Sequence, residues 1–364
     1  MIVLHKTGGV QWAGMMLALL VAVGVGGTGD LPFSAVAAVL VTGLIFLAPR
    51  GQANWLVIAA MAAGVSIAAM TLLPFAQSAF LFWAMVLAVW LGAWLVVASV
   101  AESPRLPGLA GRAQSLLAPL AFGATLLWLW ETTVRALDVP RVILPAPSLI
   151  WDRLIRSTDI LWVDFVQTFV KGALSGYAIG VGAALVFALL VDRSDFLRRG
   201  LLPVGNFLAA LPIIGTAPIM VMWFGFDWPS KAAVVVAMVF FPMLVNTVQG
   251  LAATDAMQRD LMRTYNASWT QSLLKLRLPA AMPFIFNGLK IASTLALIGA
   301  IVAEFFGSPT RGMGFRISTE VGRLQLDMVW AEIAVAALAG SLFYGILALA
   351  ERGVTFWHPS QRKR

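Results

Sequence analysis

TDAMQRDLMRTYNASWTQSLLKLRLPAAMP, residues 254–283, is the longest polar interruption in a chain that otherwise consists of apolar segments. Its first part predicts a short helix from Asp255 to Tyr265, because apolar residues recur there at helical spacing. A helix in an aqueous loop can bury such a stripe only against another molecule. The residues of this apolar stripe are Met257, Leu261, Met262 and Tyr265.

A second helix is predicted directly after the first. Asn266 stands where the first helix ends, and asparagine tolerates the left-handed backbone conformation that is common at helix C-termini. The motif SWTQ, which begins at Ser268, has the form of a capping box and therefore predicts a helix start. We expect Pro279 to end this second helix, since proline disfavours helical geometry in the residue before it. The segment is thus predicted to be a helix–turn–helix between two apolar spans.

The composition is that of a membrane protein. Of the 364 residues, 60% are hydrophobic and 12% are charged, whereas soluble domains are about half apolar and about a quarter charged. The net charge of +8 fits basic residues gathered on cytoplasmic loops better than it fits nucleic-acid binding. The chain has no cysteine and only two histidines, both near its ends, so we expect no catalytic centre or metal site built on these residues.

About ten transmembrane helices are predicted, since roughly 20 apolar residues are needed to cross a bilayer. We divide the chain into an N-terminal extension of about four helices (1–101), a cytoplasmic linker (102–114), a six-helix core (115–352) that contains the loop 254–283, and a basic cytoplasmic tail (353–364). The predicted spans are 12–26, 33–48, 55–73, 79–100, 116–137, 165–191, 201–224, 231–251, 284–306 and 328–350.

The loops indicate how these spans are oriented. An even number of spans places both termini on one side, and most of the lysine and arginine residues in loops then face that side. Because basic residues accumulate on cytoplasmic loops, we expect the termini and the loop 254–283 in the cytoplasm. The proline-rich segment 138–164 is predicted to stay outside the bilayer, with a short amphipathic helix at 148–155 on its surface.

Four of the ionisable residues within the predicted spans are considered as candidates, because charge there is costly and often functional. Lys171 and Lys290 are long enough to extend their amines to the bilayer surface, and anchoring is favoured over solute contact for both. Glu304 is too short to do so; it could line a pathway, pair with a basic residue or brace a gate. Glu131 could lie at the interface.

Proline and glycine interrupt the predicted span 201–224. They would kink the helix and free backbone carbonyls, which are tolerated at membrane depth only where protein buries them or a cavity holds water. This span and the span 284–306 are therefore predicted to form walls of a translocation pathway; the alternative is a kink that serves packing alone. Asparagine in such a place could also bond between helices. The candidate pathway or gate residues are Pro212, Gly215, Pro218, Asn246, Ser293 and Glu304.

The stretch MRTYNASWTQSLLKLRLPAAMPFIFNGLKIASTLALIGAIVAE, residues 262–304, resembles the cytoplasmic signature loop of ABC-importer permeases and the gating span that follows it. The likeness extends over about 144–357, and it leaves the first four spans outside. Within that family the chain is similar to importers of sulfonates, taurine, nitrate and thiamine pyrimidine precursors. The residues that carry the match are Arg263, Thr264, Ala267, Ser268, Leu278, Pro279, Ala280, Pro283, Gly288, Leu289, Lys290, Ala303 and Glu304.

By this resemblance the first helix is a coupling helix that sits in a groove of a cytoplasmic ATPase. The alternative is a helix that lies on the membrane surface with its basic side toward lipid headgroups. The chain departs from the family at Asn266, where glycine is usual, and at Tyr265, which is bulkier than the usual aliphatic residue. The implied coupling residues are Met257, Leu261, Met262, Arg263, Thr264, Tyr265, Asn266, Ala267, Ser268 and Pro279.

The resemblance also concerns the glycine-containing loop after the span 284–306. We expect this loop to form a tight turn beneath a docked solute-binding protein, which is periplasmic or lipid-anchored. The implied docking residues are Arg311, Gly312, Gly314 and Arg316.

These observations predict an all-α polytopic membrane protein with a type I ABC-importer permease core and an N-terminal multi-helix extension. The resemblance implies the permease subunit of an ATP-driven importer of a small polar organic solute, either a sulfonate- or nitrate-like anion or a thiamine-precursor- or flavin-like heterocycle. No GxxxxGK[ST] motif occurs, so we expect ATP and Mg²⁺ to bind a partner ATPase. This chain itself is expected to hold no cofactor, no metal and no catalytic residue.

The expected partners are ABC ATPase subunits, the solute-binding protein, a second permease in a homodimer or pseudo-homodimer, and the lipid of the bacterial inner membrane, with no nucleic acid. An ion-coupled secondary transporter is the alternative; it should show paired halves with broken helices, and no internal repeat is visible. An integral-membrane enzyme is a further alternative, but the sequence shows no cluster of acidic and histidine residues at one depth.

Overall fold

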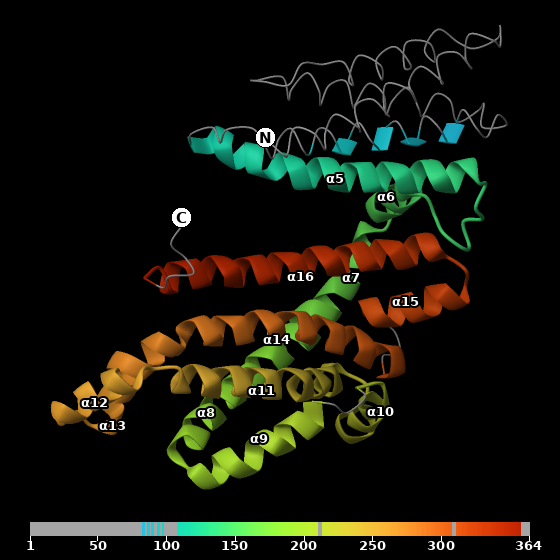
Figure 1. Ribbon diagram of the computed structural model, residues 1–364. Helices are drawn as coiled ribbons and strands as arrows, with labels where there is room; N and C mark the ends of the chain where they lie inside the picture. The colour runs from blue at the N-terminus through green and yellow to red at the C-terminus, as the bar shows by residue number, and fades with distance from the viewer. Residues whose placement is uncertain are drawn as a thin grey trace, which may run out of the picture. The chain divides into compact units, whose positions relative to one another are not determined.

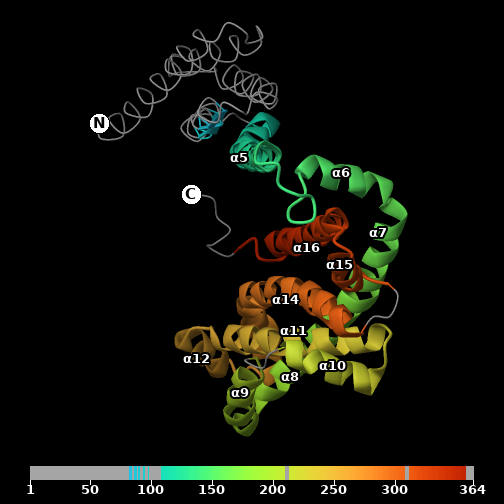
Figure 2. The ribbon, with the colours of Figure 1, turned by 90° about the vertical axis from the view of Figure 1, so that its right-hand side faces the viewer.

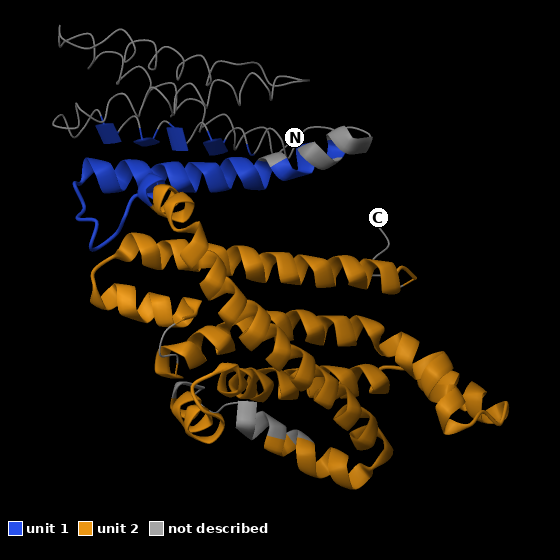
Figure 3. Cartoon of the chain, turned by 180° about the vertical axis from the view of Figure 1, so that it is seen from behind, with its two compact units in different colours: residues 1–149 blue, residues 150–364 orange. Residues whose placement is uncertain are grey.

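The computed structural model describes residues 108–209, 213–307 and 311–357, together with some helical residues between 82 and 97. In these ranges all regular structure is helical, as the predicted all-α class requires. The chain divides into two compact units, residues 1–149 and 150–364, coloured blue and orange in Figure 3. The first three predicted spans lie outside the described residues, so the predicted count of ten spans is not confirmed.

The described part of the first unit centres on helix α5 (Gly108–Ala136) and the start of α6 (Pro147–Arg156). Glu131 connects them: its carboxylate accepts hydrogen bonds from the Ser148 amide at 2.9 Å, the Ser148 hydroxyl at 2.7 Å and Arg135 Nε at 2.5 Å. A carboxylate near a helix N-terminus satisfies amide donors that have no partner within the helix. Glu131 is therefore buried and binds Ser148 within the first unit, and its predicted place at the bilayer interface stays a prediction.

The helices of the second unit form a bundle (Figures 1 and 2). In Figure 1, α11, α14 and α16 run side by side, and the helix made of α7, η2 and α8 crosses them. The elements are α7 (Thr158–Phe165), η2 (Val166–Leu174), α8 (Ser175–Arg193), α9 (Asp195–Ala209), α10 (Ile213–Phe224), α11 (Trp228–Ala252), α12 (Ala256–Thr264), α13 (Trp269–Ser272), η3 (Leu273–Arg277), α14 (Leu278–Gly307), α15 (Met313–Gly322) and α16 (Leu326–Val354).

The core of this unit lies where α8, α11 and α14 meet, and small residues allow the close approach. Ala184 of α8 and Ala292 of α14 are fully buried there. At Gly176 an added Cβ would lie 2.5 Å from the Cβ of Val235 and 2.8 Å from the carbonyl oxygen of Ala232. Helices in a bilayer gain little from hydrophobic burial against one another, so tight packing through small residues is their main source of association.

Five helical runs in the described residues are long and apolar enough to cross a membrane: 114–136, 158–193, 228–252, 269–307 and 326–354. They overlap the predicted spans 116–137, 165–191, 231–251, 284–306 and 328–350. The remaining predicted span of the core, 201–224, covers the end of α9 and all of α10. Residues 210–212 lie outside the described residues, so the predicted interruption of this span by proline stays a prediction.

Two predicted boundaries also shift. The segment 138–164 does contain the expected short helix, as α6, but α7 begins at Thr158 and runs without a break into η2 and α8. Asp164 therefore lies inside a long helix. It is fully buried, and its carboxylate is paired with Arg316 and accepts a hydrogen bond from the Gly312 amide. Helix α5 begins at Gly108, so the last part of the expected linker 102–114 is helical.

Candidate functional site

The helix–turn–helix of the segment 254–283 forms as predicted from its local signals. Asp255 caps α12 by accepting a hydrogen bond from the Met257 amide. Asn266 has a φ of 50°, which is the left-handed conformation expected at the turn. Ser268 and Gln271 make both hydrogen bonds of the capping box at the start of α13. We call α12 and α13 together the coupling pair.

The coupling pair protrudes from one end of the bundle, beyond the ends of α11 and α14 (Figure 1). On α12 the side chains of Met257 and Tyr265 are each 78% exposed, and Leu261 is 56% exposed. Met262 is half-buried, so three of the four residues of the predicted apolar stripe face outward. Exposed aromatic and aliphatic side chains aligned on one helical face indicate a surface for a partner.

The other residues predicted for coupling give the pair its shape. The Thr264 hydroxyl donates to the Asp260 carbonyl at 3.0 Å, and Arg263 pairs with Asp260 at 3.5 Å on the exposed surface. Ala267 is half-buried, and its amide donates to the Met262 carbonyl across the turn. The first two contacts lie within α12, and the hydrogen bond of Ala267 closes the turn that leads to α13.

Pro279 does not end the second helix, and that prediction is wrong. The helix continues from Trp269 to Gly307, through α13, η3 and α14. The five residues of η3, Leu273–Arg277, have π-helical hydrogen bonds, which span one residue more than those of an α-helix. This wider turn directly precedes Pro279 and accommodates a residue that cannot donate a hydrogen bond and would crowd the carbonyl four positions before it.

Three long-range contacts fasten α13 of the coupling pair and the segment η3 that follows it to the bundle. Arg277 binds Asp192 at the end of α8, with nitrogen–oxygen distances of 2.7 and 2.5 Å, and its Nε donates to the Leu251 carbonyl of α11 at 3.1 Å. The guanidinium of Arg193 lies 5.3 Å from the centroid of the Trp269 ring, at a distance typical of a cation–π contact. These contacts tie α13 and η3 to the ends of α8 and α11.

The residues predicted for a pathway or gate do not gather at one place. Pro212 lies outside the described residues, and Gly215 and Pro218 are exposed on α10. Asn246 accepts a hydrogen bond from Asn287 at 3.0 Å, which links α11 to α14. The hydroxyl of Ser293 is turned to its own helix, where it donates to the Lys290 carbonyl at 2.7 Å. Their role in translocation stays a prediction.

Glu304, the remaining predicted gate residue, is 1% exposed near the end of α14. Its Oε2 accepts hydrogen bonds from the Thr168 hydroxyl of η2 at 2.7 Å and from the Gly314 amide of α15 at 2.9 Å. Thr168 in turn accepts from the Met313 amide at 2.7 Å. Glu304 thus holds the first turn of α15 and one face of η2 at the same time.

Asp164 binds the same end of α15 as Glu304 does. Its Oδ1 accepts from the Gly312 amide at 2.7 Å and its Oδ2 from Arg316 Nε at 2.8 Å. Buried charge is costly unless it is paired and hydrogen-bonded, and these contacts supply both conditions for Asp164. We call Asp164, Thr168, Glu304 and Arg316, with the amides of Gly312, Met313 and Gly314, the α15 network.

The α15 network explains why glycine occupies positions 312 and 314. Gly312 has a φ of 123°, and a Cβ there would meet the carboxyl group of Glu304. A Cβ on Gly314 would meet the carbonyl oxygen of Ile301. Both glycines are buried and Arg316 is partly buried, while Arg311 is exposed. Gly312, Gly314 and Arg316 therefore shape the start of α15, and Arg311 precedes it. Their role in docking stays a prediction.

Sequence reasoning missed several residues that the structure brings to these sites. Glu332 is fully buried on α16 and lies next to Asp164; as an acid inside a predicted span, it carried a usable signal. Lys231 is also buried and donates to the carbonyl oxygens of Phe226 and Gly307. Asp164 and Asp192 had no such signal, because each sits at the edge of an apolar segment. Lys290 pairs with Glu351 at 2.7 Å, and its predicted anchoring at the bilayer surface stays a prediction.

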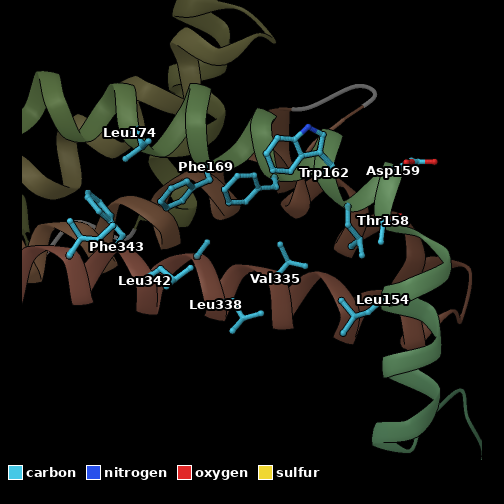
Figure 4. A pocket seen from close by; sticks show the side chains of 14 residues that line it. Leu154, Thr158, Asp159, Trp162, Phe169, Leu174, Val335, Leu338, Leu342 and Phe343 are labelled. Carbon is cyan, nitrogen blue, oxygen red and sulfur yellow. The ribbon is translucent and has the colours of Figure 1, made fainter. Parts of the chain in front are cut away.

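An open groove of about 930 Å³ lies between the helix of α7 and η2 and helix α16 (Figure 4). Its walls are apolar, with Phe169, Leu342 and Phe343 along its length, and Thr158 and Asp159 are the polar lining residues. Such a surface does not suit a small polar solute. In the described part of the chain, no group of three or more histidine and acidic side chains is placed to hold a metal ion.

Comparisons with known proteins match most of the second unit. A family model described as "Binding-protein-dependent transport system inner membrane component" matches residues 176–356. A "Probable ABC transporter permease protein" of Haemophilus influenzae is 33% identical, over 65% of this chain and 96% of that protein. A formylaminopyrimidine transport permease protein of Halalkalibacterium halodurans is 30% identical, over 69% and 99%. A riboflavin transport system permease protein of Chloroflexus aurantiacus is 29% identical, over 65% and 87%.

Proposed function

This chain belongs to the family of permeases of binding-protein-dependent ABC importers, and on that premise we propose that it is the transmembrane subunit of an ATP-driven importer of a small polar organic solute. Two permease subunits, identical or similar, would form the pathway in a bacterial inner membrane. Two ATPase subunits on the cytoplasmic side would bind ATP and Mg²⁺, and a periplasmic or lipid-anchored binding protein would deliver the solute. This chain would carry out no covalent chemistry.

The observation that carries this proposal is the exposed apolar stripe of α12. Met257, Leu261 and Tyr265 protrude from the end of the bundle on a helix that is capped at its start and turned at Asn266. Full burial of one large apolar side chain stabilises a complex by about 1.5–3 kcal/mol, so three of them suit a helix that fits into a groove of a partner. A cytoplasmic ATPase is the partner that an importer permease requires.

The way in which the coupling pair is fastened suggests how ATP would act. The pair joins α14 without a break and is held to α8 and α11 through Arg277. Closure of the ATPases would move the pair, and this movement would change the orientation of α14 and its neighbours from inward-open to outward-facing. Coupling of this kind requires only that ATP-bound ATPases bind one of the two conformations more tightly.

The names of the relatives suggest the class of solute. They are permeases for formylaminopyrimidine and riboflavin transport, and another is a taurine transport permease of Escherichia coli with 27% identity. We propose for this chain a sulfonate- or nitrate-like anion, or a heterocycle related to thiamine precursors or flavins. The binding protein would set the choice between them, and a binding assay on that partner with taurine, formylaminopyrimidine and riboflavin would decide it.

The test of the proposed function uses a charge on the apolar stripe. In Leu261→Asp, the tagged chain should still insert into the membrane but should lose the ATP hydrolysis that co-purifies with the unmodified chain. The matched control is Arg259→Gln, which is exposed on the other side of α12 and changes the net charge by the same amount. Full ATP hydrolysis in the Leu261→Asp preparation would contradict the proposal.

A further inference from the structure

One uninterrupted helix links the two sites of the second unit. Residues 269–307 form a single run of 39 residues that begins in the coupling pair and ends at Gly307. At a rise of 1.5 Å per residue, Leu278 and Glu304 are separated by roughly 39 Å along this helix. Figure 1 shows α12 and α13 at one end of α14 and α15 at the other. A stiff element of this length carries a displacement from one end to the other.

The far end of this helix is not free to move alone. Glu304 accepts hydrogen bonds from Gly314 of α15 and Thr168 of η2, and all three groups are buried. The last turns of α14 also press directly on α15, because an added Cβ on Gly314 would meet the carbonyl oxygen of Ile301. A shift of α14 must therefore either carry α15 with it or leave buried polar groups without partners, which is unfavourable.

We propose that Glu304 is a positioning residue that transmits the movement of α14 to α15, so that ATP binding on one side of the membrane repositions α15 on the other. This inference rests on the proposed function. In it, Glu304 contacts no solute; it acts through the Gly314 amide and the Thr168 hydroxyl. Asp164 also binds the neighbouring Gly312 amide and Arg316. The start of α15 is thus held at several points, and α15 moves as a rigid body.

The experiment places a reporter on α15. The chain has no cysteine, so Val321→Cys, at a side chain that is 49% exposed, provides one labelling position for an environment-sensitive fluorophore. The labelled chain is purified from its native membrane with its ATPase, and emission is recorded with and without Mg²⁺ and a non-hydrolysable ATP analogue. The labelled Val321→Cys chain without further substitutions is the background, and a nucleotide-dependent change in its emission is expected.

Variants of the α15 network then test the transmission. Glu304→Ala should abolish the nucleotide-dependent change while the co-purified ATPase still hydrolyses ATP, and Glu304→Gln, which keeps an acceptor oxygen, should restore it. Gly314→Ala should also abolish the change by forcing α15 away from Ile301. Its matched control is Gly322→Ala at the other end of the same helix, where an added Cβ meets nothing within 4 Å; this control should respond as the background does.

The outcomes are distinct. A full emission change in Glu304→Ala would overturn the inference. If Glu304→Ala does not assemble with the ATPase, Thr168→Val removes the hydroxyl that binds Glu304 and the Met313 amide but keeps the carboxyl group of Glu304; a reduced change is expected, and a full one would overturn the inference. A background sample that hydrolyses ATP without any change at position 321 would contradict the inference alone. A background sample that neither binds nor hydrolyses ATP would contradict the proposed function as well.

Discussion

The guanidinium of Arg277 binds both carboxylate oxygens of Asp192, at 2.7 and 2.5 Å, and this ion pair fixes the base of the coupling pair to the end of α8. The two side chains are 16% and 6% exposed. Planar, two-point contacts of this kind define both the position and the angle of a guanidinium. The orientation in which α12 leaves the bundle therefore depends on one residue pair.

Loss of this ion pair should destabilise the bundle. Arg277→Ala leaves the Asp192 carboxylate buried without its partner, which costs about 3 kcal/mol, and the melting temperature of the purified chain in detergent should fall. Arg263→Ala is the control, because its pair with Asp260 is exposed on both sides and is worth less than about 1 kcal/mol. Equal melting temperatures for the two variants would show that the buried pair does not support the fold.

The turn at Asn266 should accept glycine and reject branched residues. Its φ of 50° is accessible to glycine at no steric cost, whereas other side chains lose roughly 1–2 kcal/mol in this conformation. Asn266→Gly should therefore keep the co-purified ATP hydrolysis, and Asn266→Val should reduce it by displacing α12. The comparison of hydrolysis rates in the two preparations, normalised to the amount of permease, checks this. Full activity in Asn266→Val would mean that the turn geometry does not control ATPase binding.

Two glycines of α8 should respond oppositely to alanine. At Gly176 an added Cβ would lie 2.5 Å from Val235 in α11, so Gly176→Ala should separate the helices and lower the melting temperature. At Gly182 an added Cβ meets nothing within 4 Å, so Gly182→Ala should be neutral or stabilising by up to about 1 kcal/mol through helix propensity. Thermal unfolding in detergent measures both. A stabilising Gly176→Ala would show that the α8–α11 contact is looser than its geometry indicates.

Loss of the ion pair between Lys290 and Glu351 should destabilise the chain more than loss of the exposed charge of Lys171. Lys290 and Glu351 are 17% and 13% exposed, and Lys290→Met leaves the Glu351 carboxylate without its partner at a cost of about 3 kcal/mol. Lys171→Met removes the same charge from an exposed position on η2 and should have a smaller effect. Resistance to protease digestion at rising temperature compares the two variants. A larger loss for Lys171→Met would contradict the anchoring role of Lys290.

Much of the coupling pair could be predicted without coordinates, because its signals lie within a few residues of one another. The capping box of Ser268 and Gln271 and the left-handed Asn266 are both observed. The prediction that Pro279 ends the helix is wrong because a π-helical turn just before a proline can accommodate it within a helix. No residue pattern in η3 indicates that turn.

The α15 network could be predicted only in part. Glu304 was a candidate because an acid within an apolar span is costly wherever it lies. Its partner Thr168 is 136 positions away, and Asp164 is 148 positions from the Gly312 amide that it binds. Nothing in the neighbourhood of Asp164 distinguishes a buried acid from a solvated one at the edge of a span. Its burial follows from the presence of Arg316 and of a helix N-terminus on another part of the chain.

The amino-acid sequence alone predicts a helical membrane protein with a capped, amphipathic helix pair in a polar loop, because hydropathy and helix capping act over one or two turns of chain. The fold alone decides which charges are buried and paired: Arg277 with Asp192, Lys290 with Glu351, and Asp164 with Arg316. The physical reason is that electrostatic and hydrogen-bond energies depend on distances of a few ångströms in space, which separation along the chain does not reveal.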